Sequence, residues 1–184
     1  MPNTQFHYDF NEHKHRYAVW TAARAVQRSF TSTDNINDAI KQTSLRKFAE
    51  RSEAITQDMF DEMQADWCAV LIAKFNGMKV PCTYGRASKI IAIYLKTSII
   101  LTEKGDGLNC DVIHPPIDRI LLKALSKDVK GLQGVSKKGW TQYERKDYQE
   151  LFQLLRNHNL PFNWRLEQYW KPEQEKQTAD EAFL

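Results

Sequence analysis

A lysine and an aspartate are the two side chains of this sequence best suited to carry out chemistry. Lys89 follows a glycine turn and lies one turn into a nearly apolar segment, and Asp118 begins a second segment after His114-Pro115-Pro116. A lysine amine that has lost its proton attacks electrophilic carbon. A carboxylate beside it balances positive charge that develops on the substrate. The sequence therefore predicts an amine nucleophile with an acidic partner.

The predicted helix from Ala87 to Leu101 is apolar on nearly every face, which favours a buried helix. Burial and the positive end of the helix dipole both lower the pKa of a lysine such as Lys89. Lys96 is seven residues further on and shares its stripe. The alternative is that both lysines form the one solvent-exposed stripe of the helix, while Asp118 is only a carboxylate that stabilises a helix start.

The block that carries these residues reads G-R-A-S-K-I-I-A-I-Y-L-K-T and later P-I-D-R-I-L-L, between Gly85 and Leu122. It resembles the active-site region of the helix-hairpin-helix DNA glycosylase superfamily, and also uncharacterised bacterial proteins with the same H-P-P-I-D block. In that superfamily, main-chain N–H groups of a glycine hairpin bind a DNA phosphate. In bifunctional members a lysine attacks the deoxyribose C1′ and an aspartate assists. The resemblance implies these roles for Gly85, Lys89 and Asp118.

The sequence also departs from the pattern of the superfamily. The turn reads Pro81-Cys82-Thr83-Tyr84-Gly85, with one glycine where two are usual, and Thr102 to Asn109 lengthens the connection to the aspartate. No four-cysteine cluster follows, so we expect no iron–sulfur cluster and no other cofactor.

The resemblance implies a DNA-binding protein with a DNA glycosylase or glycosylase/AP-lyase site that acts on a damaged or modified base. Lys89 and Asp118 would be catalytic. The residues expected to contact nucleic acid are Tyr84, Gly85, Arg86, Lys96, His114, Arg119 and Lys123. One alternative is a non-catalytic helical nucleic-acid-binding or interaction protein that keeps the same architecture. Another is a helical ribonuclease that uses Arg156 and His158.

Basic residues are concentrated after the proposed aspartate. The net charge of the 184 residues is +3, but eight lysines and arginines against two acids give +6 between Arg119 and Lys146. Such a stretch would steer and hold a phosphate backbone. Alternatively, a loop rich in lysine and glycine is only a well-solvated connection.

Helical periodicity runs through most of the chain, and no alternating strand pattern is present. Besides the two segments above, we expect helices over residues 11–29, 33–48, 56–75, 144–157 and 164–170. The sequence thus predicts an all-α fold, with a single compact domain over residues 1–170 that includes a helix-hairpin-helix-like element. Residues 171–184 are expected to be a flexible polar tail.

Several other features restrict the class of protein. No apolar stretch is long enough to cross a membrane, and no signal-peptide pattern begins the chain. The three cysteines fit a reducing cytoplasm and should pack as small core residues. His7, His13 and His15 lack the spacing of a helical metal site, so no metal is expected. Arg16, Trp20, Arg24 and Arg28 form a stripe that either contacts nucleic acid or packs on the protein surface.

Overall fold

The computed structural model describes residues 8–26 and 30–172, and within them all regular structure is helical. The prediction of an all-α fold is therefore confirmed. The α-helices in chain order are α1 (Phe10–Ala25), α2 (Thr33–Lys41), α3 (Leu45–Ala49), α4 (Gln57–Gly77), α5 (Tyr84–Leu95), α6 (Arg119–Asp128) and α7 (Arg145–Asn157). Shorter helical segments are the π-helical η1 (Lys96–Ile100) and the 3₁₀ turns η2 (Cys110–Val112), η3 (Trp140–Gln142) and η4 (Trp164–Tyr169).

Polar side chains fix where the main helices begin. The side chains of Ser32, Thr56 and Thr83 each accept a hydrogen bond from a backbone N–H of the following helix. Asp118 does the same for α6, where its Oδ1 accepts from the N–H of Leu121 at 2.9 Å. These bonds satisfy backbone donors that a helix start leaves unpaired, so each helix is anchored at a defined residue.

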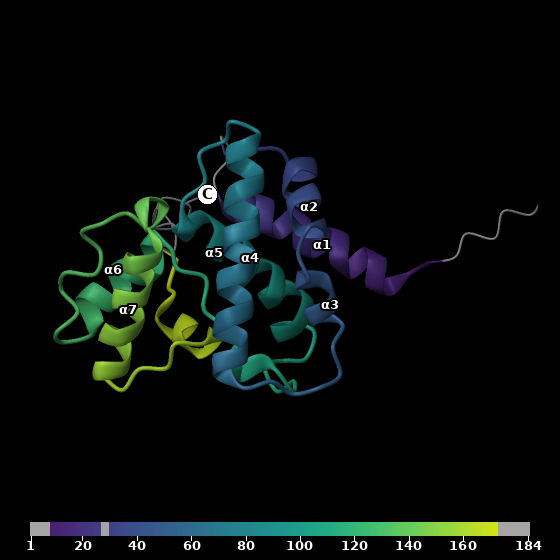
Figure 1. Ribbon diagram of the computed structural model, residues 1–184. Helices are drawn as coiled ribbons and strands as arrows, with labels where there is room; N and C mark the ends of the chain where they lie inside the picture. The colour runs from purple at the N-terminus through teal and green to yellow at the C-terminus, as the bar shows by residue number, and fades with distance from the viewer. Residues whose placement is uncertain (1–7, 27–29, 173–184) are drawn as a thin grey trace, which may run out of the picture.

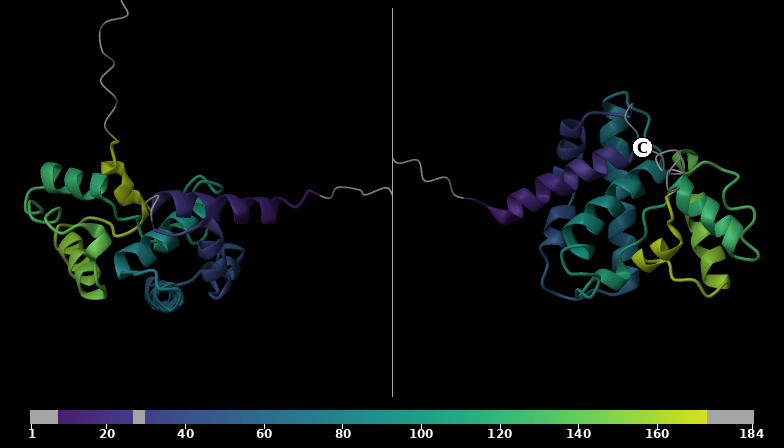
Figure 2. Two further views of the ribbon diagram at one scale, coloured as in Figure 1. Left: turned by 90° about the horizontal axis from the view of Figure 1, so that it is seen from above. Right: turned by 180° about the vertical axis from the view of Figure 1, so that it is seen from behind.

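Helix α5 is the centre of the fold. Its apolar residues are almost completely buried, as its sequence predicts, and it packs against α1, α4, η3 and α7. Figures 1 and 2 show α6 and α7 on one side of the molecule and α1 to α3 on the other, with α4 beside α5 in the middle. The N-terminal half of α1 projects beyond the other helices (Figure 1). Chemical groups on α5 are therefore placed between two groups of helices.

Some predicted boundaries are wrong. The helix expected over residues 33–48 is interrupted between α2 and α3, because Thr43 Oγ1 donates to the Ile40 carbonyl and accepts from the N–H of Leu45. The C-terminal segment forms the 3₁₀ turn η4 rather than an α-helix. Gly85, expected in the turn of a hairpin, lies inside α5, because Thr83 caps that helix two residues earlier. Residues 173–184 of the expected tail lie outside the described residues.

The three cysteines lie within the folded domain. Cys68, Cys82 and Cys110 are free thiols buried in the core. Burial raises the pKa of the Cys82 thiol to about 12 and that of Cys68 further, so these groups stay protonated. None of the described helices combines the length and the apolar character needed to span a bilayer.

Candidate functional site

Lys89 and Asp118 meet in the structure. The Lys89 Nζ donates to Asp118 Oδ2 over 3.3 Å, which joins the second turn of α5 to the N-cap of α6. The two side chains are 8% and 16% exposed. The amine and the acid thus form a largely buried ion pair between the two groups of helices.

The Lys89 amine lies in an environment that disfavours its charge. Burial lowers the pKa of Lys89, and the charge of Asp118 opposes that shift only in part. The ammonium nitrogen also lies 4.4 Å from the centre of the Trp140 ring, a contact that favours the charged form and so opposes the effect of burial, as Asp118 does. Loss of the proton from Lys89 is therefore easier than for an ordinary surface lysine.

Asp118 is fixed through both carboxylate oxygens. Oδ1 accepts the capping bond from α6, and Oδ2 accepts from Lys89 and from the indole N–H of Trp170 at 3.0 Å. The Trp170 side chain follows η4 and is 37% exposed. The acid is consequently oriented by its own helix start, while Trp170 forms the solvent-facing side of the pair.

A second ion pair lies beside the first. Lys96 Nζ is 2.7 Å from Glu167 of η4 and 5.8 Å from the Trp170 ring centre. Burial raises the pKa of Glu167, although Lys96 opposes this effect. Both lysines of the predicted stripe therefore face carboxylates. Lys96 and Glu167 hold η4, and with it Trp170, against α5.

Arg119 and Lys123 lie on the exposed face of α6, immediately after Asp118. Together with Lys127 and Lys171 they line a hollow of about 650 Å³. Arg119 also lines a hollow of about 350 Å³ whose other walls include Trp140 and Lys137. Positive charge therefore lies next to the Lys89–Asp118 pair.

Gly85 and Arg86 have roles different from those that the resemblance implies. The N–H of Gly85 donates to the Tyr143 carbonyl at 2.9 Å, and a Cβ at this glycine would lie 1.9 Å from the Trp140 carbonyl oxygen. That N–H is therefore already paired within the protein. The Arg86 guanidinium donates to the Pro81 carbonyl and lies 5.0 Å from the Phe30 ring centre, so it stabilises the turn before α5.

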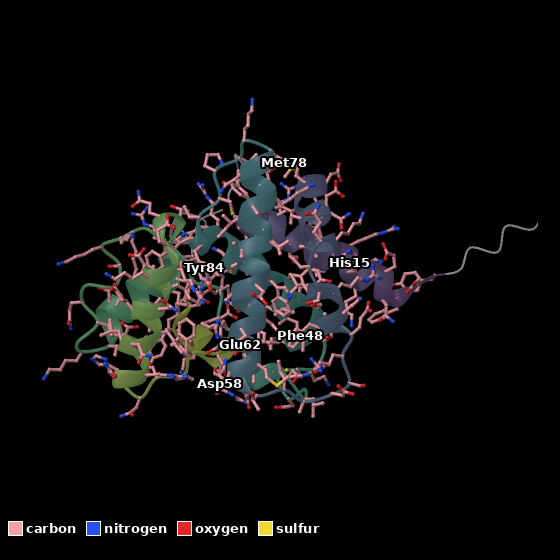
Figure 3. All side chains as sticks on the ribbon, in the orientation of Figure 1. His15, Phe48, Asp58, Glu62, Met78 and Tyr84 are labelled. Carbon is pink, nitrogen blue, oxygen red and sulfur yellow. The ribbon has the colours of Figure 1, made fainter. Side chains whose placement is uncertain are left out.

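Tyr84 and His114 lie in a different hollow. They line a space of about 350 Å³ between α4 and α7. Figure 3 shows Tyr84 and Glu62, another residue of this wall, on the side of α4 that faces α7. The lining of this hollow includes neither Lys89 nor Asp118. The structure therefore does not bring Tyr84 and His114 together with the amine and the acid.

His114 is the centre of a buried polar network. Its Nε2 is 2.8 Å from Asp61 Oδ1, and its Nδ1 is 3.4 Å from the Tyr148 hydroxyl. Burial lowers the pKa of His114, while Asp61 opposes the shift. The rings of Phe60 and Phe162 pack edge-on against the imidazole. This arrangement orders the segment that leads to Asp118.

The remaining candidates are separate from the pair. On α1, Trp20 is exposed, stacks on Tyr17 and lies 5.3 Å from the Arg24 guanidinium, whereas Arg28 lies outside the described residues. His158 contacts the Leu154 carbonyl at the end of α7. Within residues 8–26 and 30–172, no three histidine, cysteine or acidic side chains are grouped as a metal site.

No family model, curated protein or solved structure matches this chain. The geometry of the side chains is therefore the basis for a function. It supports an amine nucleophile whose proton can pass directly to a carboxylate, at a site bordered by positive charge.

Trp140 and Glu167 are residues of this site that sequence reasoning did not identify. Each is brought to α5 by a segment distant in sequence, and no spacing within the chain signals the approach. The hydrogen bond from Trp170 to Asp118 likewise becomes evident only in three dimensions.

Proposed function

We propose that the chain is a DNA-binding protein with a DNA glycosylase or glycosylase/AP-lyase-like site, in which Lys89 is the nucleophile and Asp118 the acidic partner. One observation supports it most. A largely buried lysine amine lies 3.3 Å from a carboxylate that a helix cap holds in place. Amine catalysis needs this combination, because burial favours the neutral amine and the carboxylate can accept its proton.

The proposed reaction begins with displacement of the base at C1′ and continues with opening of the sugar ring. Neutral Lys89 attacks the deoxyribose C1′, the bond between C1′ and the base breaks, and the base leaves with the electron pair and takes up a proton. Asp118 accepts the proton that the amine loses and balances positive charge on the sugar. The C1′–O4′ bond then breaks, O4′ keeps the electron pair and takes up a proton, and a protonated Schiff base between Lys89 and C1′ results. Loss of a proton from C2′ then allows the 3′ phosphate to leave with the electrons of its C3′–O bond.

Access to the amine would require movement of Trp170. The indole covers the pair from the solvent side and ends a short 3₁₀ turn. The target nucleotide would have to leave the base stack to reach C1′ against Lys89, as it does in enzymes that act on bases in duplex DNA. The displaced indole could then stack on an exposed base.

Borohydride trapping tests this chemistry. A duplex with an abasic site, and duplexes with a panel of damaged bases, are incubated with the protein and sodium borohydride, which reduces a Schiff base to a stable amine. We expect a covalent protein–DNA species with the wild-type chain and at least a hundredfold less with Lys89→Ala. The matched control is Lys47→Ala, which removes an exposed lysine of α3 that has no role in the proposed site and should retain the adduct at saturating DNA.

Because Trp170 covers the ion pair, a second candidate function is favoured in which Lys89 does not react with a substrate. In a non-catalytic helical nucleic-acid-binding module, the Lys89–Asp118 pair would only join α5 to α6 beneath Trp170. This candidate predicts DNA binding without any trapped species in wild type or variants. Absence of trapping across the panel, with DNA affinity intact, would refute the catalytic proposal in favour of the binding module.

A further inference from the structure

Five cations near the Lys89–Asp118 pair have no acidic partner among the residues that the structure describes. Among the ion pairs of the described residues, none involves Arg119, Lys123, Lys127, Lys137 or Lys171. Their side chains also donate none of the hydrogen bonds found within this part of the chain. Lys138, in the same region, differs because it pairs with Asp147 at 2.6 Å. Within residues 8–26 and 30–172, no acidic side chain therefore neutralises these five cations.

Three of these cations form a row along α6. Arg119, Lys123 and Lys127 are four residues apart, which places them on one face with a rise of about 6 Å from each to the next. They line one wall of the larger hollow, and Lys171 lines it as well. Asp128 is the single acid in this lining. Evenly spaced charge along a concave surface suits a linear polyanion better than a single small anion.

The segment after α6 contributes a further cation, Lys137. This segment loops outward before it returns to α7 (Figures 1 and 2). Lys137 lines the smaller hollow, and Arg119 belongs to both hollows. Trp140 in the smaller hollow supports Lys89, while Lys171 follows the indole that covers Asp118. Neither hollow is lined by Lys89 or Asp118 themselves, but each is lined by a residue that contacts one of them or is next to such a residue in the chain.

We propose that this surface, defined by Arg119, Lys123, Lys127, Lys137 and Lys171, binds the phosphate backbone of one nucleic-acid strand and leads it past Lys89. The inference rests on the proposed function for its position, since the strand would deliver its sugar to the amine. It replaces the phosphate grip that the resemblance assigns to Gly85, whose N–H is already bonded to Tyr143.

A nucleic acid fits this surface better than an anionic membrane does. Membrane-surface helices insert large apolar side chains beside their basic residues. The exposed large apolar side chains of the described residues lie on other elements, apart from Trp170 at the edge of the surface. An indole in that position can stack on a base, as aromatic side chains do in proteins that bind single strands.

The salt dependence of DNA binding tests the proposal. Affinity for a short duplex with an abasic-site analogue is measured by fluorescence anisotropy for the wild type, for Arg119→Ala/Lys123→Ala/Lys127→Ala and for Lys14→Ala/Lys47→Ala/Lys74→Ala. With five phosphate contacts, the wild type should lose about 500-fold in affinity between about 50 and 200 mM salt. The α6 triple variant keeps two contacts and should lose only about 12-fold over the same range. The second triple variant removes equal charge from α1, α3 and α4 and should retain the wild-type slope.

Two results would refute the proposed phosphate-binding surface. Equal slopes in the two triple variants would overturn the proposal. Binding to vesicles of phosphatidylcholine and phosphatidylserine that depends on the α6 cations, with DNA binding unaffected by their loss, would also overturn it. Lys89→Ala measured in parallel separates the two proposals. If the wild type forms no trapped species but the α6 variant still changes the salt slope, the chemistry alone is refuted. If the wild type is trapped and Lys89→Ala is not, but the α6 variant leaves the salt slope unchanged, the surface alone is refuted.

Discussion

Asp118 combines two functions in one carboxylate. One oxygen caps α6 and the other accepts from both Lys89 and Trp170. Because Lys89 is only 8% exposed, its ammonium depends on this oxygen for charge compensation. The carboxylate is therefore important for stability whether or not the site is catalytic.

Asp118→Asn should lower the free energy of unfolding by about 3 kcal/mol, because asparagine can still cap α6 but leaves a buried ammonium without its counter-charge. Urea denaturation measures the effect. Asp111→Asn is the matched control, since Asp111 pairs with Arg165 at an exposed site and its loss should cost less than about 1 kcal/mol. The double variant Lys89→Met/Asp118→Asn should recover part of the loss. Equal effects at Asp118 and Asp111 would contradict the account.

His114 predicts how stability depends on pH. Its pKa is lowered by burial, so in the range below about 6.5 the unfolded chain takes up a proton that the folded chain resists. The stability from neutral His114 is complete above that value and is lost as the pH falls through it. His114→Phe should therefore show a shallower fall in unfolding free energy between about pH 7 and 5. A fall as steep as that of the wild type would exclude this role for His114.

At the scale of elements, the contact between α5 and η3 is unusually close. The Trp140 carbonyl occupies the space where any side chain at position 85 would lie. This contact places the Trp140 ring against Lys89. The glycine that the resemblance assigns to a DNA hairpin is thus required here for helix packing.

Gly85→Ala should destabilise the fold by about 3 kcal/mol, because the new methyl group forces η3 away from α5. Gly77→Ala serves as the control. It lies in the last turn of α4 with no atom near its absent Cβ, and helix propensity predicts a neutral or slightly stabilising change. Thermal unfolding of both variants distinguishes the cases, and a harmless Gly85→Ala would show that the close approach does not constrain the structure.

The sequence predicted the helices well where the pattern is local. Periodicity located α4 and α7 to within two residues, because burial of one face is a local property. The helix predicted from Ala87 to Leu101 instead begins at Tyr84, because Thr83 caps it, and becomes π-helical from Lys96. The break at Thr43 was missed because two short side-chain bonds there outweigh a continuous helical pattern. The meeting of Lys89 with Asp118 was anticipated through the resemblance. Trp140, Glu167 and Trp170 reach the site through long-range packing. The spacing of residues in a single sequence does not reveal such contacts.

At the scale of the whole molecule, the candidate site lies where two groups of helices meet. Lys89 comes from the central helix α5, Asp118 from α6, and the indole of Trp170 from the segment after η4. A relative movement of these elements, or of Trp170 alone, would change the exposure of the amine. The accessibility of Lys89 therefore reports on the assembly of the site.

Trp170→Ala should increase the rate at which formaldehyde and borohydride methylate Lys89 at least tenfold, because the covering indole is removed. Mass spectrometry of tryptic peptides measures the rate for each lysine. Exposed Lys47 is the internal reference and should be methylated equally in both proteins. An unchanged rate at Lys89 would mean that another part of the molecule shields the amine.

The most direct test of the central claim is the location of the covalent bond in the borohydride-trapped protein–DNA species. After digestion with nuclease and protease, the peptide that carries the sugar remnant is sequenced by mass spectrometry. We expect a secondary amine at Lys89 Nζ, and its absence in Lys89→Ala. A remnant on another lysine or on the N-terminal amine, with Lys89 unmodified, would contradict it.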